Sequence, residues 1–195
     1  MTIPERTLKS IRFLETQVNV ESFYYYSSFF SAMNSQDKLL VAYNLTSMEN
    51  FLPAGRLLLR EQGRFLGQID VPDIPVNSTY TMIFGADADV SYRREVTVLP
   101  EEYNDRSMIY YVEYVFENVK PSRDVVVYFS ESFSAFKSFE IEDFSRPRND
   151  LDLMDIQLRG TDLRGYFVLP RQAEPFVISY KLLVYKARPK YRRSS

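Results

Sequence analysis

The stretch FLPAGRLLLREQGRFLGQIDV, residues 51–71, decides the fold of this chain. Two short extended segments, Arg56–Arg60 and Arg64–Val71, flank the loop Glu61-Gln62-Gly63, and a glycine in so short a loop is typical of a β-hairpin. Just before it, Leu52-Pro53-Ala54-Gly55 has proline and glycine where a β-turn takes them. The stretch therefore predicts strands joined by tight turns.

Five residues are assigned structural turn roles on this pattern. We expect Gly63 and Gly85 in particular to occupy backbone conformations that are costly for a residue with a Cβ atom. The full set of turn residues is Pro53, Gly55, Gly63, Gly67 and Gly85.

Strand-like segments continue on both sides of the hairpin. Their starts are spaced by roughly 8–15 residues, which favours an antiparallel sheet over alternating strands and helices. The composition agrees, because the chain of 195 residues has 15 Tyr and 15 Phe. We expect an all-β protein, an antiparallel β-sandwich with short or no helices. The expected strands are residues 18–30, 39–45, 80–84, 90–98, 108–117, 123–130, 133–141, 156–158, 166–169 and 175–185.

Three regions follow from the composition: an aromatic-rich extension (1–38), the β-sandwich domain (39–185) and a basic tail (186–195). The extension contains VNVESFYYYSSFF at 18–30, whose aromatic side chains need cover from the core or from a partner. Both alternatives stay open. The possible interface residues are Phe23, Tyr24, Tyr25, Tyr26, Phe29 and Phe30.

The last ten residues carry five positive charges and no acid, although the net charge of the whole chain is −2. A basic tail on an acidic body can contact that body, an acidic partner or phosphate. We do not expect nucleic-acid binding, because one short tail lacks a basic face and a stacking platform. The possible contacts with an anionic partner are Lys186, Arg188, Lys190, Arg192 and Arg193.

The absence of Cys and His excludes several kinds of site. The sequence cannot form a disulfide, a zinc–thiolate site, a Ser-His-Asp triad or a two-His-one-carboxylate iron site. Residues 1–17 lack the apolar core of a signal peptide, and no apolar run approaches 18 residues. We expect an intracellular, cytoplasmic protein with no membrane span; location in a virion is the other possibility.

Carboxylates are the remaining candidates for chemistry. Asp87 and Asp89, at alternate positions, could share a cation, but no loop supplies the six to eight oxygens of a calcium site. The alternative is that both accept backbone hydrogen bonds at a turn. A second, acidic segment with Arg146 and Arg148 interleaved contains Asp143, Asp150, Asp152 and Asp155. We assign no catalytic residue, no metal and no cofactor.

The order of these motifs resembles the uncharacterised C-terminal β-domain of the mucoidy-inhibitor-A-like family, over residues 41–185. The resemblance implies a β-sandwich-rich domain without an established catalytic activity, and it leaves residues 1–38 unmatched. It rests on Asn44, Leu52-Pro53-Ala54-Gly55, Phe65-Leu66-Gly67, Gly85-Ala86-Asp87, Val90, Arg93, Asn118, the Asp124–Phe129 strand, Glu131, Gly160, Gly165, Leu169-Pro170 and the Phe176–Tyr185 strand.

These observations favour a non-enzymatic protein that acts as an interaction or structural subunit of a larger assembly, such as a viral particle. Its partners would be copies of itself or another protein subunit. The alternative is a carbohydrate-active enzyme or lectin that uses Asp87, Asp89 and the acidic segment.

Overall fold

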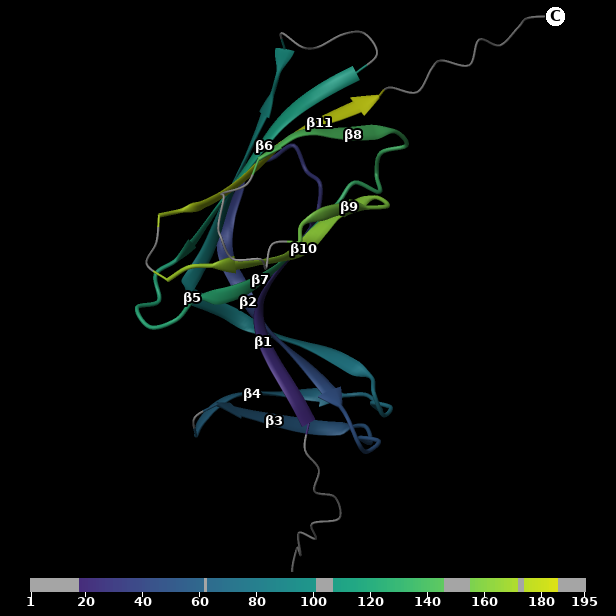
Figure 1. The fold of residues 1–195 in the computed structure, drawn as a ribbon, viewed down its shortest axis with the longest axis vertical. Coiled ribbons are helices and arrows are strands. Elements are labelled where there is room, and N and C mark those ends of the chain that lie inside the picture. Colours follow the sequence, from purple (N-terminus) through teal and green to yellow (C-terminus); the bar gives the residue numbers. More distant parts are fainter. Residues whose placement is uncertain (1–17, 62, 101–106, 146–154, 172–173, 186–195) are drawn as a thin grey trace, which may run out of the picture. The chain divides into compact units, whose positions relative to one another are not determined.

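The computed structural model describes residues 18–61, 63–100, 107–145, 155–171 and 174–185, and the part described is almost entirely β-strand (Figure 1). This confirms the all-β prediction. The strands are β1 (Val18–Phe29), β2 (Ser35–Ser47), β3 (Gly55–Glu61), β4 (Arg64–Val71), β5 (Thr79–Val98), β6 (Ser107–Asn118), β7 (Val125–Ser132), β8 (Phe139–Ser145), β9 (Gln157–Arg159), β10 (Asp162–Leu169) and β11 (Phe176–Tyr185).

Nine strands form one sheet in the order β8-β11-β6-β5-β2-β1-β7-β10-β9, and β3 and β4 form a second sheet of two strands. The large sheet is mixed rather than purely antiparallel, because β1 runs parallel to β7, with Tyr24 opposite Val127. Residues 18–38, assigned above to a separate extension, thus form β1 and the first part of β2.

The chain divides into two compact units, where the sequence suggested a single β-domain. Among the described residues, the hairpin unit comprises those in 18–21 and 44–82, and the main unit comprises those in 22–43 and 83–185. Strands β1, β2 and β5 belong in part to each unit.

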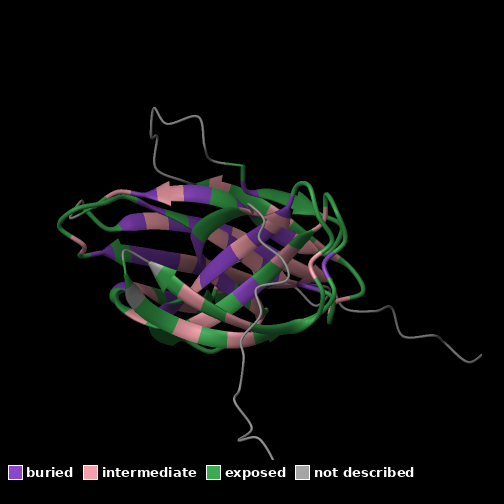
Figure 2. Cartoon of the chain, turned by 90° about the horizontal axis from the view of Figure 1, so that it is seen from below, coloured by how far each residue is buried: buried purple, intermediate pink, exposed green. Residues whose placement is uncertain are grey.

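The core of the main unit is built from aromatic side chains. Tyr114 and Phe116 of β6 pack against Phe129 of β7 and Phe167 of β10, with ring centroids 5.0 Å apart in the pairs Tyr114–Phe129 and Phe116–Phe167. Because β6 and β7 are separated by three strands in the sheet order, the sheet must curl around this core. Buried residues alternate with more exposed ones along the strands, as the two-residue period requires (Figure 2).

The hairpin formed by β3 and β4 follows the sequence prediction closely. Gly63 has a φ of 79°, which confirms the expected left-handed turn position. Gly55 is the first residue of β3, and Pro53 lies just before it, beside a bridge between Leu52 and Ile74. Gly67 lies within β4 opposite Leu59, next to a register shift in the ladder, so it is not a turn residue.

The prediction for Gly85 is wrong. Residues 79–98 form one continuous strand, β5, where the sequence suggested two strands with a bend at Gly85. Gly85 does not have a positive φ, and a Cβ atom there would meet nothing within 4 Å. Pairing along this strand overrides the local turn tendency of the Gly-Ala-Asp sequence.

Candidate functional site

The aromatic residues of β1 are mostly core residues. Phe23, Tyr24 and Tyr26 are buried, and Phe30 packs against the same core. This is the first of the two alternatives stated above, and it removes these four residues from the possible interface. Tyr25 is half-buried and stacks on Tyr128, with a centroid distance of 5.5 Å, whereas Phe29 is 74% exposed.

A buried ion pair lies inside the main unit, between Arg94 of β5 and Glu131 of β7. Their side chains are 3% and 0% exposed, and Arg94 Nη2 lies 2.8 Å from Glu131 Oε1. The guanidinium also donates from Nη1 to the carbonyl oxygens of Ser31 and Met33, at 2.7 and 2.9 Å. It therefore holds the connection between β1 and β2 against β5.

Tyrosine hydroxyls complete this buried network. Arg94 Nε donates to the Tyr114 hydroxyl at 2.9 Å, and the Tyr180 hydroxyl donates to Glu131 Oε2. Burial, and then the charge of Glu131, raise the pKa of Tyr114 and of Tyr180 well above the usual value, so both hydroxyls stay protonated. Among the described residues, no buried side-chain nitrogen or oxygen lacks a hydrogen-bond partner. The network is closed and presents no free group to a substrate.

Sequence reasoning missed Arg94, although a signal was present. Val90, Tyr92 and Arg94 alternate along β5, so all three belong to the core-facing side of the strand. An arginine at such a position needs a buried carboxylate, because an unpaired buried charge is costly.

The two aspartates proposed as a possible cation site bind a lysine instead. Lys120 Nζ lies 2.7 Å from Asp87 Oδ2 and 3.5 Å from Asp89 Oδ2. The Tyr24 hydroxyl donates to Asp87 Oδ2 at 2.6 Å, and the Asp89 backbone N–H donates to Asp87 Oδ1 at 2.9 Å. Desolvation alone would raise the pKa of Asp87, but the hydrogen bonds from Lys120 and Tyr24 outweigh it and hold that pKa below its usual value.

The two described aspartates of the second acidic segment, Asp143 and Asp155, each pair with a basic residue. Asp143 has a φ of 49° and forms an ion pair with Lys181 at 3.3 Å, whereas Asp155 pairs with Arg159 at 2.9 Å. Asp150 and Asp152 lie outside the described residues. Within the described ranges, no group of three or more Asp or Glu side chains is placed to hold a metal ion.

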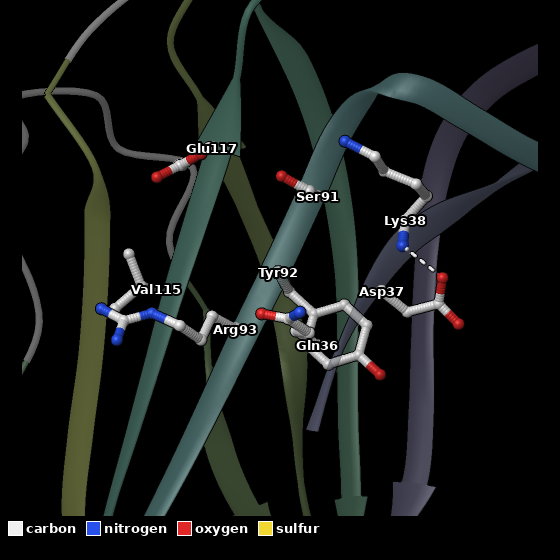
Figure 3. A pocket seen from close by; sticks show the side chains of 8 residues that line it. All are labelled: Gln36, Asp37, Lys38, Ser91, Tyr92, Arg93, Val115 and Glu117. Carbon is white, nitrogen blue, oxygen red and sulfur yellow. Dashed lines mark hydrogen bonds between the residues drawn. The ribbon is translucent and has the colours of Figure 1, made fainter. Parts of the chain in front are cut away.

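An open groove of about 410 Å³ is present in the main unit (Figure 3). Ser91 of β5 lies opposite Glu117 of β6, and Arg93 lies opposite Val115, so two short side chains alternate with two long charged ones. Three consecutive residues of β2 add an amide, a carboxylate and an ammonium. The lining residues are Gln36, Asp37, Lys38, Ser91, Tyr92, Arg93, Val115 and Glu117.

The hairpin unit exposes an unusual amount of apolar surface. Leu58, Phe65 and Leu66, which we call the tip patch, are 56%, 58% and 40% exposed. Leu58 and Phe65 lie on the same face of the hairpin, because Phe65 is opposite Arg60, two residues along from Leu58. Other exposed apolar residues of this unit are Val20, Met48, Phe51 and Val76.

The other face of the hairpin borders a small apolar pocket of about 160 Å³, which we call the base pocket. Leu45 and Ile74, both buried, lie at its inner side, and the exposed Pro53 and Arg56 lie at its rim. Its remaining lining residues are Leu52, Gly55, Leu57 and Val71.

The five basic tail residues, Lys186, Arg188, Lys190, Arg192 and Arg193, lie outside the described residues. In the part of the chain that is described, no helix has the length and apolarity needed to cross a bilayer. The chain matches no family model, no curated protein and no solved structure. The resemblance to the mucoidy-inhibitor-A-like domain therefore stays a prediction.

Proposed function

We propose that this protein is a non-enzymatic subunit of a larger assembly and that it acts through the surface of its hairpin unit. The observation that carries the proposal is the tip patch, where Leu58 and Phe65 are exposed on one face of a two-stranded sheet and Leu66 is exposed next to Phe65 in the same strand. Single exposed apolar residues are ordinary, but contiguous ones mark surfaces that a partner covers.

The geometry of the hairpin supports this proposal. An isolated two-stranded sheet is only marginally stable in water, and it gains stability when another surface packs against it. The tip patch is next to Arg60, and Arg56 and Asp70 form an exposed ion pair at 3.2 Å further along the same face. A central apolar group beside exposed charged side chains is the usual layout of a protein–protein interface.

The polar groups support a non-enzymatic role. The buried carboxylate of Glu131 pairs with Arg94 and accepts a hydrogen bond from Tyr180. The carboxylate of Asp87 pairs with Lys120 and accepts a hydrogen bond from Tyr24. A general acid or base must be free to reach a substrate proton, and these two carboxylates are held by partners of their own.

The test is the mass of the full-length chain in solution. Sedimentation velocity and light scattering should give a mass above that of the monomer, rising with concentration. A variant with a polar tip patch (Leu58→Ser, Phe65→Ser, Leu66→Ser) should remain monomeric at the same concentrations. Because all three residues are exposed, the variant should keep the far-UV circular dichroism of the parent. An unchanged mass in this variant would contradict the proposal.

The groove favours a second candidate, a binding site for a neutral, hydroxyl-rich ligand such as an oligosaccharide. It combines two carboxylates, Asp37 and Glu117, with two cations, Lys38 and Arg93, so its lining has no net charge and offers both donors and acceptors. A panel of neutral oligosaccharides titrated into labelled protein should shift amide signals of β2, β5 and β6. Loss of those shifts in Glu117→Gln would support this candidate, and the absence of shifts with every sugar would exclude it.

A further inference from the structure

We infer that the partner of the hairpin unit is a second copy of this chain, and that Phe65 of one copy enters the base pocket of the next. This inference rests on the proposed function and names the contact that carries it. It combines two features of the same unit, an exposed phenyl ring and an unfilled apolar pocket of matching size.

The size of the pocket suits one aromatic ring. An apolar cavity of about 150 Å³ in a protein is large enough to bind benzene, and the base pocket measures about 160 Å³. Six of its eight lining residues are apolar side chains, so a water molecule there would find few hydrogen-bond partners. A phenyl ring from outside would replace poorly bound water with apolar contacts.

Phe65 is an exposed phenyl group that can reach a second molecule. It is 58% exposed and lies two residues from the hairpin turn at Gly63, opposite Arg60. The base pocket lies at the other end of the same hairpin, where Gly55 pairs with Val71. The five steps along the strand from Gly55 to Arg60 span about 17 Å, so Phe65 cannot fill the pocket of its own hairpin.

The contact is therefore between two different surfaces, the tip of one copy and the base of another. Two copies can make this contact twice, about a two-fold axis, which closes a dimer with both tips and both pockets occupied. If they make it only once, one tip and one pocket stay free, and association continues into chains or closes into a ring. In both arrangements every contact joins a tip to a pocket, which a contact of tip with tip does not.

Two single variants separate the two halves of the contact. Phe65→Ser removes the ring and keeps the pocket. Gly55→Ile keeps the ring and fills the pocket, because position 55 shares a hairpin face with Leu57 and its Cβ atom would meet nothing within 4 Å. Gly55→Ser is the matched control, since it changes the same backbone position but occupies little of the pocket. Should Gly55→Ile fail to fold, Val71→Phe fills the pocket from the opposite strand.

The experiment is sedimentation velocity of the full-length chain, alone and in mixtures. The parent and Gly55→Ser should form dimers or larger species as the concentration rises, whereas Phe65→Ser and Gly55→Ile should each remain monomeric. Loss of a central aromatic anchor should raise the dissociation constant by about thirtyfold or more. An equimolar mixture of the two variants should form dimers and nothing larger, because it contains one intact tip and one intact pocket per pair.

Three results would overturn the inference. The first is a parent chain that stays monomeric at every concentration. The second is an equimolar mixture that shows no dimer. The third is a Gly55→Ile variant that assembles like the parent. If the polar tip-patch variant is monomeric in that case, the proposed function stands, and only the assignment of the base pocket as the binding site of Phe65 is wrong. If neither variant changes the mass, both proposals fail.

Discussion

Replacing Arg94 with methionine should remove a large part of the stability of the main unit. The substitution replaces the aliphatic stem of the side chain but leaves the Glu131 carboxylate buried without its partner at 2.8 Å. It also leaves the Ser31 and Met33 carbonyl oxygens without the donor that now binds them. Breaking a buried ion pair from one side costs about 3–5 kcal/mol, which is a large share of the roughly 5–15 kcal/mol that stabilises most proteins.

Urea denaturation followed by far-UV circular dichroism measures this loss. With a slope of about 2 kcal/mol per molar urea, a loss of about 4 kcal/mol lowers the midpoint by about 2 M. Arg93→Met is the matched control, because the Arg93–Glu95 ion pair lies next to Arg94 in sequence but is half exposed. An exposed pair contributes about 1 kcal/mol or less. If both variants shifted the midpoint equally, the buried network would not have the role assigned to it.

Three further predictions concern single positions. Gly63→Ala should lower the free energy of unfolding by about 1 kcal/mol because Gly63 has a φ of 79°. Gly85→Ala should change the free energy of unfolding by less than about 0.5 kcal/mol. Thermal melts of the two variants measure this difference, and equal melting temperatures would contradict it. Gly165→Ala should destabilise the protein by about 1–3 kcal/mol or more, since its Cβ atom would fall 1.6 Å from the Asp155 carbonyl oxygen. A melting temperature equal to the parent's would show that the backbone at Asp155 moves away from the Cβ atom at no cost in stability. Asp87 has a lowered pKa when folded, so its contribution to stability is complete above the unfolded pKa of about 4 and is lost as the pH falls through the folded value. Asp87→Asn should flatten the dependence of urea stability on pH in that acidic window, and an unchanged slope would contradict the assignment.

The hairpin shows how far local sequence can determine structure. Its turn needs a residue that tolerates positive φ, and the register follows from the short loop and the alternation of side chains. These are local requirements, so the segment Arg56–Val71 and the role of Gly63 could be predicted correctly. Gly85 shows the limit of the same reasoning. A Gly-Ala-Asp sequence favours a turn in isolation, but long-range pairing along β5 keeps it extended.

The sequence by itself determined the β-class of the chain, the hairpin, and the absence of any site that needs cysteine or histidine, because composition and residue spacing act over short distances. Only the tertiary structure decided which side chains meet. Tyr24 and Asp87 are 63 positions apart and share a hydrogen bond, and Arg94 and Glu131 are 37 positions apart and share a buried ion pair. The parallel pairing of β1 with β7 and the curling of the sheet bring these residues together. Such contacts depend on how distant strands are ordered, and residue types at either end of a contact do not specify that order.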